Sequence, residues 1–182
     1  MKAAVLYWSK SGNTAKAALA IKEGLEFSGV EVLWAKIEEA GEIDFFAYDL
    51  VCLGFPSINW LPAEPMTVYI KKKFSEYRGQ GRVKVGCPKV SGKNALVFCT
   101  YSGPHTGMNE ALTAGRYAGQ LFEHLGFTVL DEWYILGEFH GSLENSTKGR
   151  MGDIRGKPTP AELRKLKEDA AGMAKTIASF LA

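Results

Sequence analysis

The alternation of short apolar segments with longer segments of helical periodicity constrains the fold of this chain most. Apolar runs over residues 3–8, 30–37, 50–55, 95–100 and 128–136 have the length and composition of strands. Between and after them, residues 14–27, 62–77, 109–125 and 160–181 repeat apolar side chains at spacings of three and four. Strands that alternate with helices predict a parallel sheet with helices on both faces. We therefore expect an α/β three-layer sandwich whose five-stranded parallel sheet has the order 2-1-3-4-5.

Two local patterns add to this outline. The sequence Thr159-Pro160-Ala161-Glu162 is a capping box with proline at the first helical position, so it predicts the start of the last helix. Two long polar segments, Gly79–Lys93 and Gly137–Pro158, interrupt the alternation. Connections of this length in a compact domain are either solvated insertions or functional parts such as a lid or a subunit contact.

Length and composition exclude several classes of protein. A chain of 182 residues fits one domain, here residues 1–182, and it contains no apolar run near the ~20 residues of a membrane span. The net charge of +2 is too small to indicate a nucleic-acid-binding protein. Cys52, Cys87 and Cys99 are widely spaced and form no metal-binding pattern, so neither a metal site nor a disulfide framework is expected. The N-terminus does not resemble a signal peptide, so we expect a cytoplasmic protein without membrane contacts.

The first loop after a strand has the composition of a phosphate-binding turn. In a doubly wound sheet, ligands bind outside the carboxyl ends of the strands. A glycine permits a close backbone approach, the amides at a helix N-terminus attract anions, and hydroxyl groups add hydrogen bonds. Because the turn lacks the lysine of a Walker A motif after its glycine, it suits a single phosphate monoester. The alternative is an ordinary helix start capped by Asn13 or Thr14. The residues of this turn are Ser9, Lys10, Ser11, Gly12, Asn13 and Thr14.

The loops after the third and fourth strands are also unusual. The first contains a tryptophan between prolines, which could pack on the next helix or offer a plate for a flat aromatic ligand. The second combines a tyrosine, glycines and a histidine, and a lone loop histidine can be either a surface residue or a catalytic group. The candidate ligand-binding residues are Pro56, Ser57, Ile58, Asn59 and Trp60 in the first, and Thr100, Tyr101, Ser102, Gly103, His105 and Gly107 in the second.

Together, the three loops resemble those of the flavodoxin-like family, whose members bind FMN without a covalent bond. The turn SKSGNT matches the family's Ser/Thr-x-Ser/Thr-Gly-x-Thr signature, and LGFPSINW and CTYSGPHTG resemble its two flavin-flanking loops. The resemblance implies that the Ser9–Thr14 turn holds the FMN phosphate. It also implies that residues 56–60 and 100–107 flank the isoalloxazine ring, with either Trp60 or Tyr101 stacked on it.

The resemblance implies redox chemistry supplied by the cofactor, so no catalytic side chain and no metal are expected. Such a protein carries electrons to a redox partner protein or reduces a small acceptor such as a quinone, with NAD(P)H as a candidate donor and a homo-oligomer as a candidate assembly. The alternative is a flavodoxin-fold binding or regulatory domain that holds an anion or no cofactor, since fold alone does not establish function.

Overall fold

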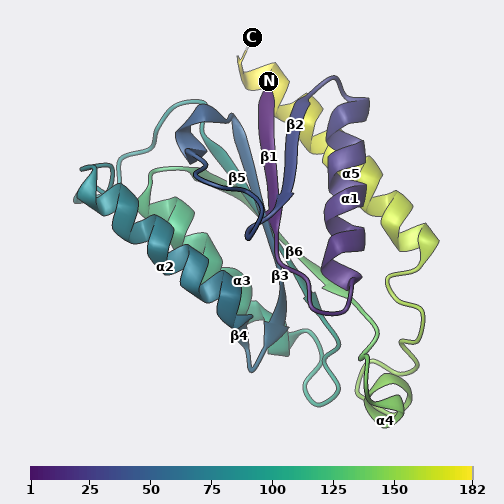
Figure 1. Ribbon diagram of the computed structural model, residues 1–182. Coiled ribbons are helices and arrows are strands. Elements are labelled where there is room, and N and C mark those ends of the chain that lie inside the picture. Colours follow the sequence, from purple (N-terminus) through teal and green to yellow (C-terminus); the bar gives the residue numbers. More distant parts are fainter. Residues whose placement is uncertain (182) are drawn as a thin grey trace.

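A computed structural model describes residues 1–181 and has the expected three-layer architecture (Figure 1). The strands are β1 (Lys2–Tyr7), β2 (Glu31–Lys36), β3 (Leu50–Ile58), β4 (Leu61–Pro62), β5 (Asn94–Tyr101) and β6 (Thr128–Leu136). The helices are α1 (Asn13–Phe27), α2 (Glu64–Gly79), α3 (Asn109–His124), α4 (Leu143–Thr147) and α5 (Pro160–Leu181), with a short 3₁₀ helix η1 (Phe45–Ala47).

The five main strands pair in parallel in the order β2-β1-β3-β5-β6, which confirms the predicted order. The two-residue strand β4 was not predicted; it pairs antiparallel with the end of β3. Helix α2 consequently begins at Glu64, two residues after its predicted start at Pro62, because Pro62 belongs to β4. A strand of two residues is too short to give a periodic signal.

Two hydrophobic clusters hold the layers together, one on each face of the sheet. Alternate side chains of β1 serve opposite faces: Val5 packs with α1 and α5, and Leu6 packs with α2 and α3. A strand buried on both faces has to be apolar throughout, which explains the continuous apolar runs in the sequence. Helices α1 and α5 lie against one face of the sheet, and α2 and α3 lie against the other (Figure 1).

The capping box predicted at residue 159 is confirmed as the start of α5. The Thr159 Oγ1 atom accepts the Glu162 amide at 3.3 Å, and the Glu162 carboxylate accepts the Thr159 amide at 2.7 Å. Partial burial raises the pKa of Glu162, but hydrogen bonds from Lys157 and Thr159 outweigh that effect and leave the pKa below its ordinary value. The ionised carboxylate therefore stabilises the helix start.

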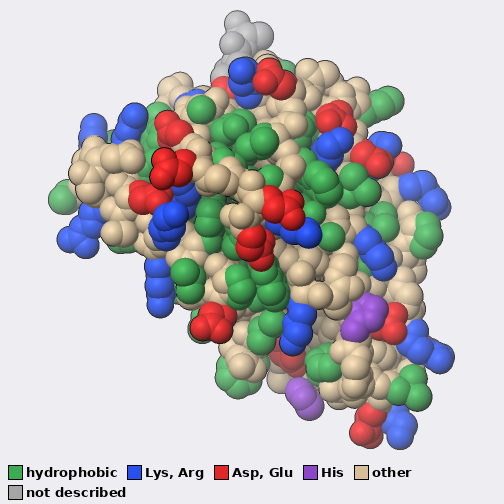
Figure 2. Space-filling model, in the orientation of Figure 1, with side chains coloured by type: hydrophobic (Ala, Val, Ile, Leu, Met, Phe, Trp, Pro, Cys, Tyr) green, Lys and Arg blue, Asp and Glu red, His purple; other side chains and the backbone are tan. Residues whose placement is uncertain are grey.

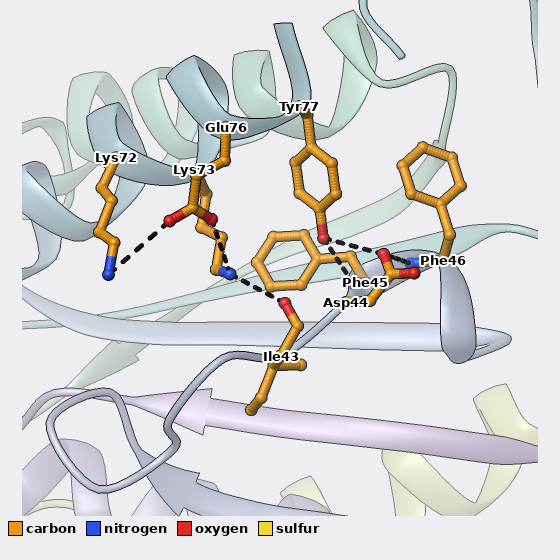
Figure 3. Close-up of polar contacts among 8 residues, drawn as sticks. All are labelled: Ile43, Asp44, Phe45, Phe46, Lys72, Lys73, Glu76 and Tyr77. Carbon is orange, nitrogen blue, oxygen red and sulfur yellow. Dashed lines mark hydrogen bonds and ion pairs between the residues drawn. The ribbon is translucent and has the colours of Figure 1, made fainter. Parts of the chain in front are cut away.

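A buried lysine ties α2 to the segment between β2 and β3 (Figure 3). Lys73 is 5% exposed, and its Nζ donates to the Ile43 carbonyl and to the Glu76 carboxylate, both at 2.9 Å. The same ammonium lies 5.8 Å from the centre of the Phe45 ring and 5.9 Å from that of Tyr77. The two hydrogen bonds and the aromatic rings compensate for the loss of water around this charge.

The Gly79–Lys93 segment has no helix or strand beyond the end of α2, and it lies between α2 and the start of β5. Lys89 donates to the Phe127 carbonyl at 2.8 Å and Lys93 donates to the Tyr48 carbonyl at 3.0 Å, so part of its positive charge fixes neighbouring loops. Figure 2 shows further basic side chains (blue) in the region of α2. No helix among residues 1–181 is long and apolar enough to cross a membrane.

Candidate functional site

A cavity of about 690 Å³ lies at the carboxyl ends of β1, β3 and β5, where the sheet topology predicts a ligand. Each of the three predicted loops contributes to its wall. Of the predicted site residues, the structure brings together at this cavity Lys10, Ser11, Asn13, Thr14, Pro56, Ser57, Ile58, Asn59, Trp60, Thr100, Tyr101, Ser102, Gly103 and His105. Ser9, Gly12 and Gly107 belong to the same loops but do not line the cavity.

The turn before α1 is shaped by a left-handed glycine and a serine that points inward. Gly12 is the N-cap residue and has a φ of 97°, a conformation that favours glycine. A glycine has no side chain, so Gly12 itself makes no capping hydrogen bond. The alternative in which Asn13 or Thr14 caps the helix is wrong, because both residues lie inside the first turn. The Ser9 Oγ atom instead accepts the amides of Gly12 at 3.1 Å and Ala15 at 3.3 Å.

The amides of Asn13 and Thr14 remain free at this helix N-terminus. They have no acceptor among residues 1–181, as is usual for the first turn of a helix. Their side chains, by contrast, are engaged: Thr14 Oγ1 and Thr100 Oγ1 share a buried hydrogen bond of 2.7 Å, and Asn13 Nδ2 donates to the Glu138 carbonyl at 3.0 Å. The main chain thus supplies unpaired donors where the helix dipole favours an anion.

Trp60 stands at the tip of the hairpin that joins β3 to β4. The two loop residues, Asn59 and Trp60, have φ values of 51° and 66°, so both are left-handed, as in a type I′ turn. Asparagine tolerates this conformation, but a tryptophan there is uncommon. Trp60 is also 63% exposed and lines the cavity. A strained and exposed aromatic plate at a cavity wall is a functional candidate.

Tyr101 forms a buried part of the same wall. It is 9% exposed, and burial raises the pKa of its phenol. The loop that follows is fixed by Glu110, whose carboxylate accepts the amides of His105 at 2.8 Å and Thr106 at 2.7 Å. The Glu110 carbonyl also accepts a hydrogen bond from Ser57, so one residue of α3 connects the two loops that flank the cavity.

The Gly137–Pro158 segment supplies a wall that the sequence did not predict. It contains the short helix α4, and its residues Glu138, Phe139, His140 and Asn145 line the cavity. Pro104 and Glu110 complete the lining. The Ser102 hydroxyl donates to the Gly137 carbonyl at 2.8 Å, which attaches the segment to the third loop. The sequence left open a solvated insertion or a functional part such as a lid or a subunit contact, and the contact of this segment with the cavity favours a functional part.

The cavity has a polar end and an aromatic wall. Among the described residues, no cluster of three or more metal-ligating side chains occurs. Burial raises the pKa values of the Cys52 and Cys99 thiols, so both are inert core residues. Histidine side chains (purple in Figure 2) are visible at the end of the molecule where α4 lies. The arrangement can hold a ligand that has an anionic group at one end and a flat ring at the other.

Comparison with known proteins places the fold. No family model matches the sequence, and no curated protein matches it significantly. Among solved structures, a flavodoxin from the domain Archaea is 21% identical, with a TM-score of 0.64 over 98% of this chain and 99% of that one. Oxidised Flavodoxin 1 from Bacillus cereus is 16% identical, with a TM-score of 0.68 over 96% of this chain and 98% of its own.

Part of a larger protein has a similar fold. Rubredoxin oxygen:oxidoreductase from Desulfovibrio gigas is 15% identical, with a TM-score of 0.63 over 100% of this chain but only 37% of that one. Identities this low carry the fold and not the function. Strand order, layer arrangement and structural similarity over nearly the whole chain agree, and the chain therefore has the flavodoxin-like fold.

Proposed function

We propose that this chain binds FMN in the cavity and works as a flavin redox protein. The proposal depends on one observation: the same cavity is lined by a helix N-terminus with free amides and by aromatic side chains. The unpaired amides at the start of α1 lie at one end, and the aromatic side chains of Trp60, Tyr101 and Phe139 line the wall. FMN joins a phosphate monoester to a flat ring, so its two parts match the two parts of the cavity.

The main chain of the turn before α1 would hold the phosphate. The free amides of Asn13 and Thr14 can donate to its oxygens, and the helix dipole adds to the attraction. A side chain at Gly12 would meet no atom within 4 Å, so its φ of 97°, and not crowding, is what requires glycine there. The shape of the turn therefore depends on this one residue.

Trp60 would stack on the ring, because its plate is exposed at the cavity whereas Tyr101 is almost entirely buried. When bound, FMN supplies the one- and two-electron chemistry. The chain's own residues bind and orient it: Glu110 holds the loops on either side in register, and the 138–145 stretch covers part of the cavity from water. Electrons would pass to a redox partner protein or to a small acceptor such as a quinone.

The test is a titration of the purified, flavin-free chain with FMN, in which the quenching of flavin fluorescence measures binding. Gly12→Ala should lower the affinity about tenfold or more, because alanine disfavours φ 97° and the amides would turn away. Gly29→Ala is the matched control: Gly29 lies just after the other end of α1, has φ 77° and is equally uncrowded. Both variants should lose similar stability, but only Gly12→Ala should lose FMN.

A wild-type chain that neither contains nor takes up FMN would contradict the proposal and favour a binding or regulatory domain without flavin. If FMN binds, oxidation of NAD(P)H with a quinone acceptor distinguishes an enzyme from a carrier. Turnover no faster than that of free FMN would favour a carrier between proteins. Turnover well above free FMN would favour reduction of a small acceptor.

A further inference from the structure

His140 lines the cavity, but neither the sequence motifs nor the proposed function assigns it a role. It lies on the segment after β6, and its side chain is exposed. Its Nε2 atom is 3.4 Å from Oδ1 of Asn13, the first residue of α1. The imidazole therefore lies at the polar end of the cavity, beside the free amides of the helix N-terminus.

The packing of the neighbouring backbone keeps His140 at this place. Asn13 Nδ2 donates to the Glu138 carbonyl at 3.0 Å, and a Cβ atom at Gly137 would lie 2.6 Å from the same Nδ2. A larger residue at 137 would therefore press on the Asn13 side chain. His140 and Asn13 are 127 positions apart in the sequence, and the packing of Gly137 against the Asn13 side chain brings their two segments together.

An anion at the start of α1 would change the charge around the imidazole. The α1 dipole places partial positive charge at this end of the cavity, and Lys10 on the first loop also lines it. The other titratable groups of the lining are Glu138 on the same segment and Tyr101, His105 and Glu110 on other elements. A phosphate at the start of α1 would bring up to two negative charges, which favour the imidazolium form of a nearby histidine.

We propose that His140 is a phosphate-binding residue that takes up a proton when FMN binds and so helps to select FMN over flavins without phosphate. The inference rests on the proposed function. Protonated histidine has two N–H donors, so one can keep the contact with Asn13 while the other meets a phosphate oxygen. The segment after β6 would then contribute a charged donor to a site otherwise made of main-chain amides.

Calorimetric titration in two buffers of different ionisation enthalpy measures the protons taken up as FMN binds. At pH 7, wild type should take up roughly half a proton more per FMN than His140→Gln. His140→Gln should also bind FMN about tenfold more weakly, a charge-assisted hydrogen bond being lost, while its affinity for riboflavin changes less than about twofold. His124→Gln, at the end of α3 and outside the cavity, should match wild type in both measurements.

Several results would overturn the inference. Equal proton exchange in wild type and His140→Gln would show that this imidazole does not respond to the phosphate. An equal loss of FMN and riboflavin affinity would show that His140 acts by packing alone. A loss of proton uptake in His105→Gln instead would assign the role to the opposite loop. In each of these cases FMN still binds and the proposed function survives, whereas a wild-type chain that binds no FMN would refute both.

Discussion

Trp60 offers a test in which fold stability and flavin affinity should change in opposite directions. A non-glycine residue in the left-handed region costs ~1–2 kcal/mol, and Trp60 has a φ of 66°. Trp60→Gly removes this cost, while the greater freedom of glycine in the unfolded chain takes back ~0.5–1 kcal/mol. The side chain is 63% exposed, so most of its area already faces water before the substitution. The net of the two backbone effects is a gain of up to ~1.5 kcal/mol in the free energy of unfolding.

The same substitution should weaken FMN binding. Stacking of a flat heterocycle on an aromatic side chain contributes ~1–3 kcal/mol, which corresponds to a loss of affinity of roughly 10- to 100-fold. Trp60→Ala separates the two effects, because alanine keeps the left-handed strain but removes the plate. Asn59→Gly is the backbone control: asparagine tolerates its φ of 51°, so the gain in stability there should be smaller, and any loss of FMN affinity should be smaller than in the Trp60 variants.

The assays are urea unfolding of the flavin-free proteins and titration of each with FMN. A destabilised Trp60→Gly variant would show that the tryptophan packs on the protein and that its backbone strain is compensated locally. Unchanged FMN affinity in both Trp60 variants would refute the stacking role and leave Tyr101 as the remaining candidate. A gain in stability together with a loss of affinity is the result that the structure predicts.

Three further substitutions test the framework around the site. Lys73→Met should cost ~2–3 kcal/mol of unfolding free energy, because it removes two hydrogen bonds and leaves the buried Ile43 carbonyl unpaired (Figure 3). Lys72 is the control, because its exposed ammonium lies 3.7 Å from the same Glu76 carboxylate. Lys72→Met should cost under about 0.5 kcal/mol in the same urea unfolding assay. The lowered pKa of Glu162 means that its stabilisation is complete above the pKa of an unfolded glutamate and is lost as pH falls through the lower folded value. Glu162→Gln should therefore be less stable than wild type by ~1 kcal/mol at pH 7, and thermal melts should show that difference shrinking below about pH 4. Thr100→Val should cost ~1–2 kcal/mol by leaving the buried Thr14 hydroxyl unpaired, and the double variant with Thr14→Val should lose less than the sum of the single losses in the same unfolding assay.

The parts of the structure that the sequence predicted are those set by local patterns. The β1 run is apolar on both faces, and the Thr159–Glu162 capping box fixes the start of α5 through bonds within four residues. The loop positions followed from the topology, because the carboxyl ends of parallel strands meet at one edge. These features depend on neighbours in sequence or on a general rule of sheet connection.

The parts that could not be predicted depend on distant contacts. Nothing in the composition of the Gly137–Pro158 segment indicates that Glu138 and His140 lie against Asn13, more than 120 positions earlier. The left-handed backbone at Trp60 could not be predicted either, because it results from the hairpin between β3 and β4, and β4 itself was not predicted. A glycine at 137, followed by polar residues, was the one available signal of a close approach, and it is weak because glycines are frequent throughout this chain.

The composition of the hydroxyl-rich turn before α1 does not by itself show which of its groups would bind an anion. Ser9 holds the amides of Gly12 and Ala15, and Thr14 and Asn13 are bonded to other segments, so three of its polar side chains fix the loops. A phosphate held there would depend mainly on main-chain amides, which side-chain deletion does not remove. Ser11→Ala should then weaken FMN binding less than Gly12→Ala does, although serine carries the donor and glycine carries none. The opposite order would mean that hydroxyl groups, and not the backbone, make the anion site.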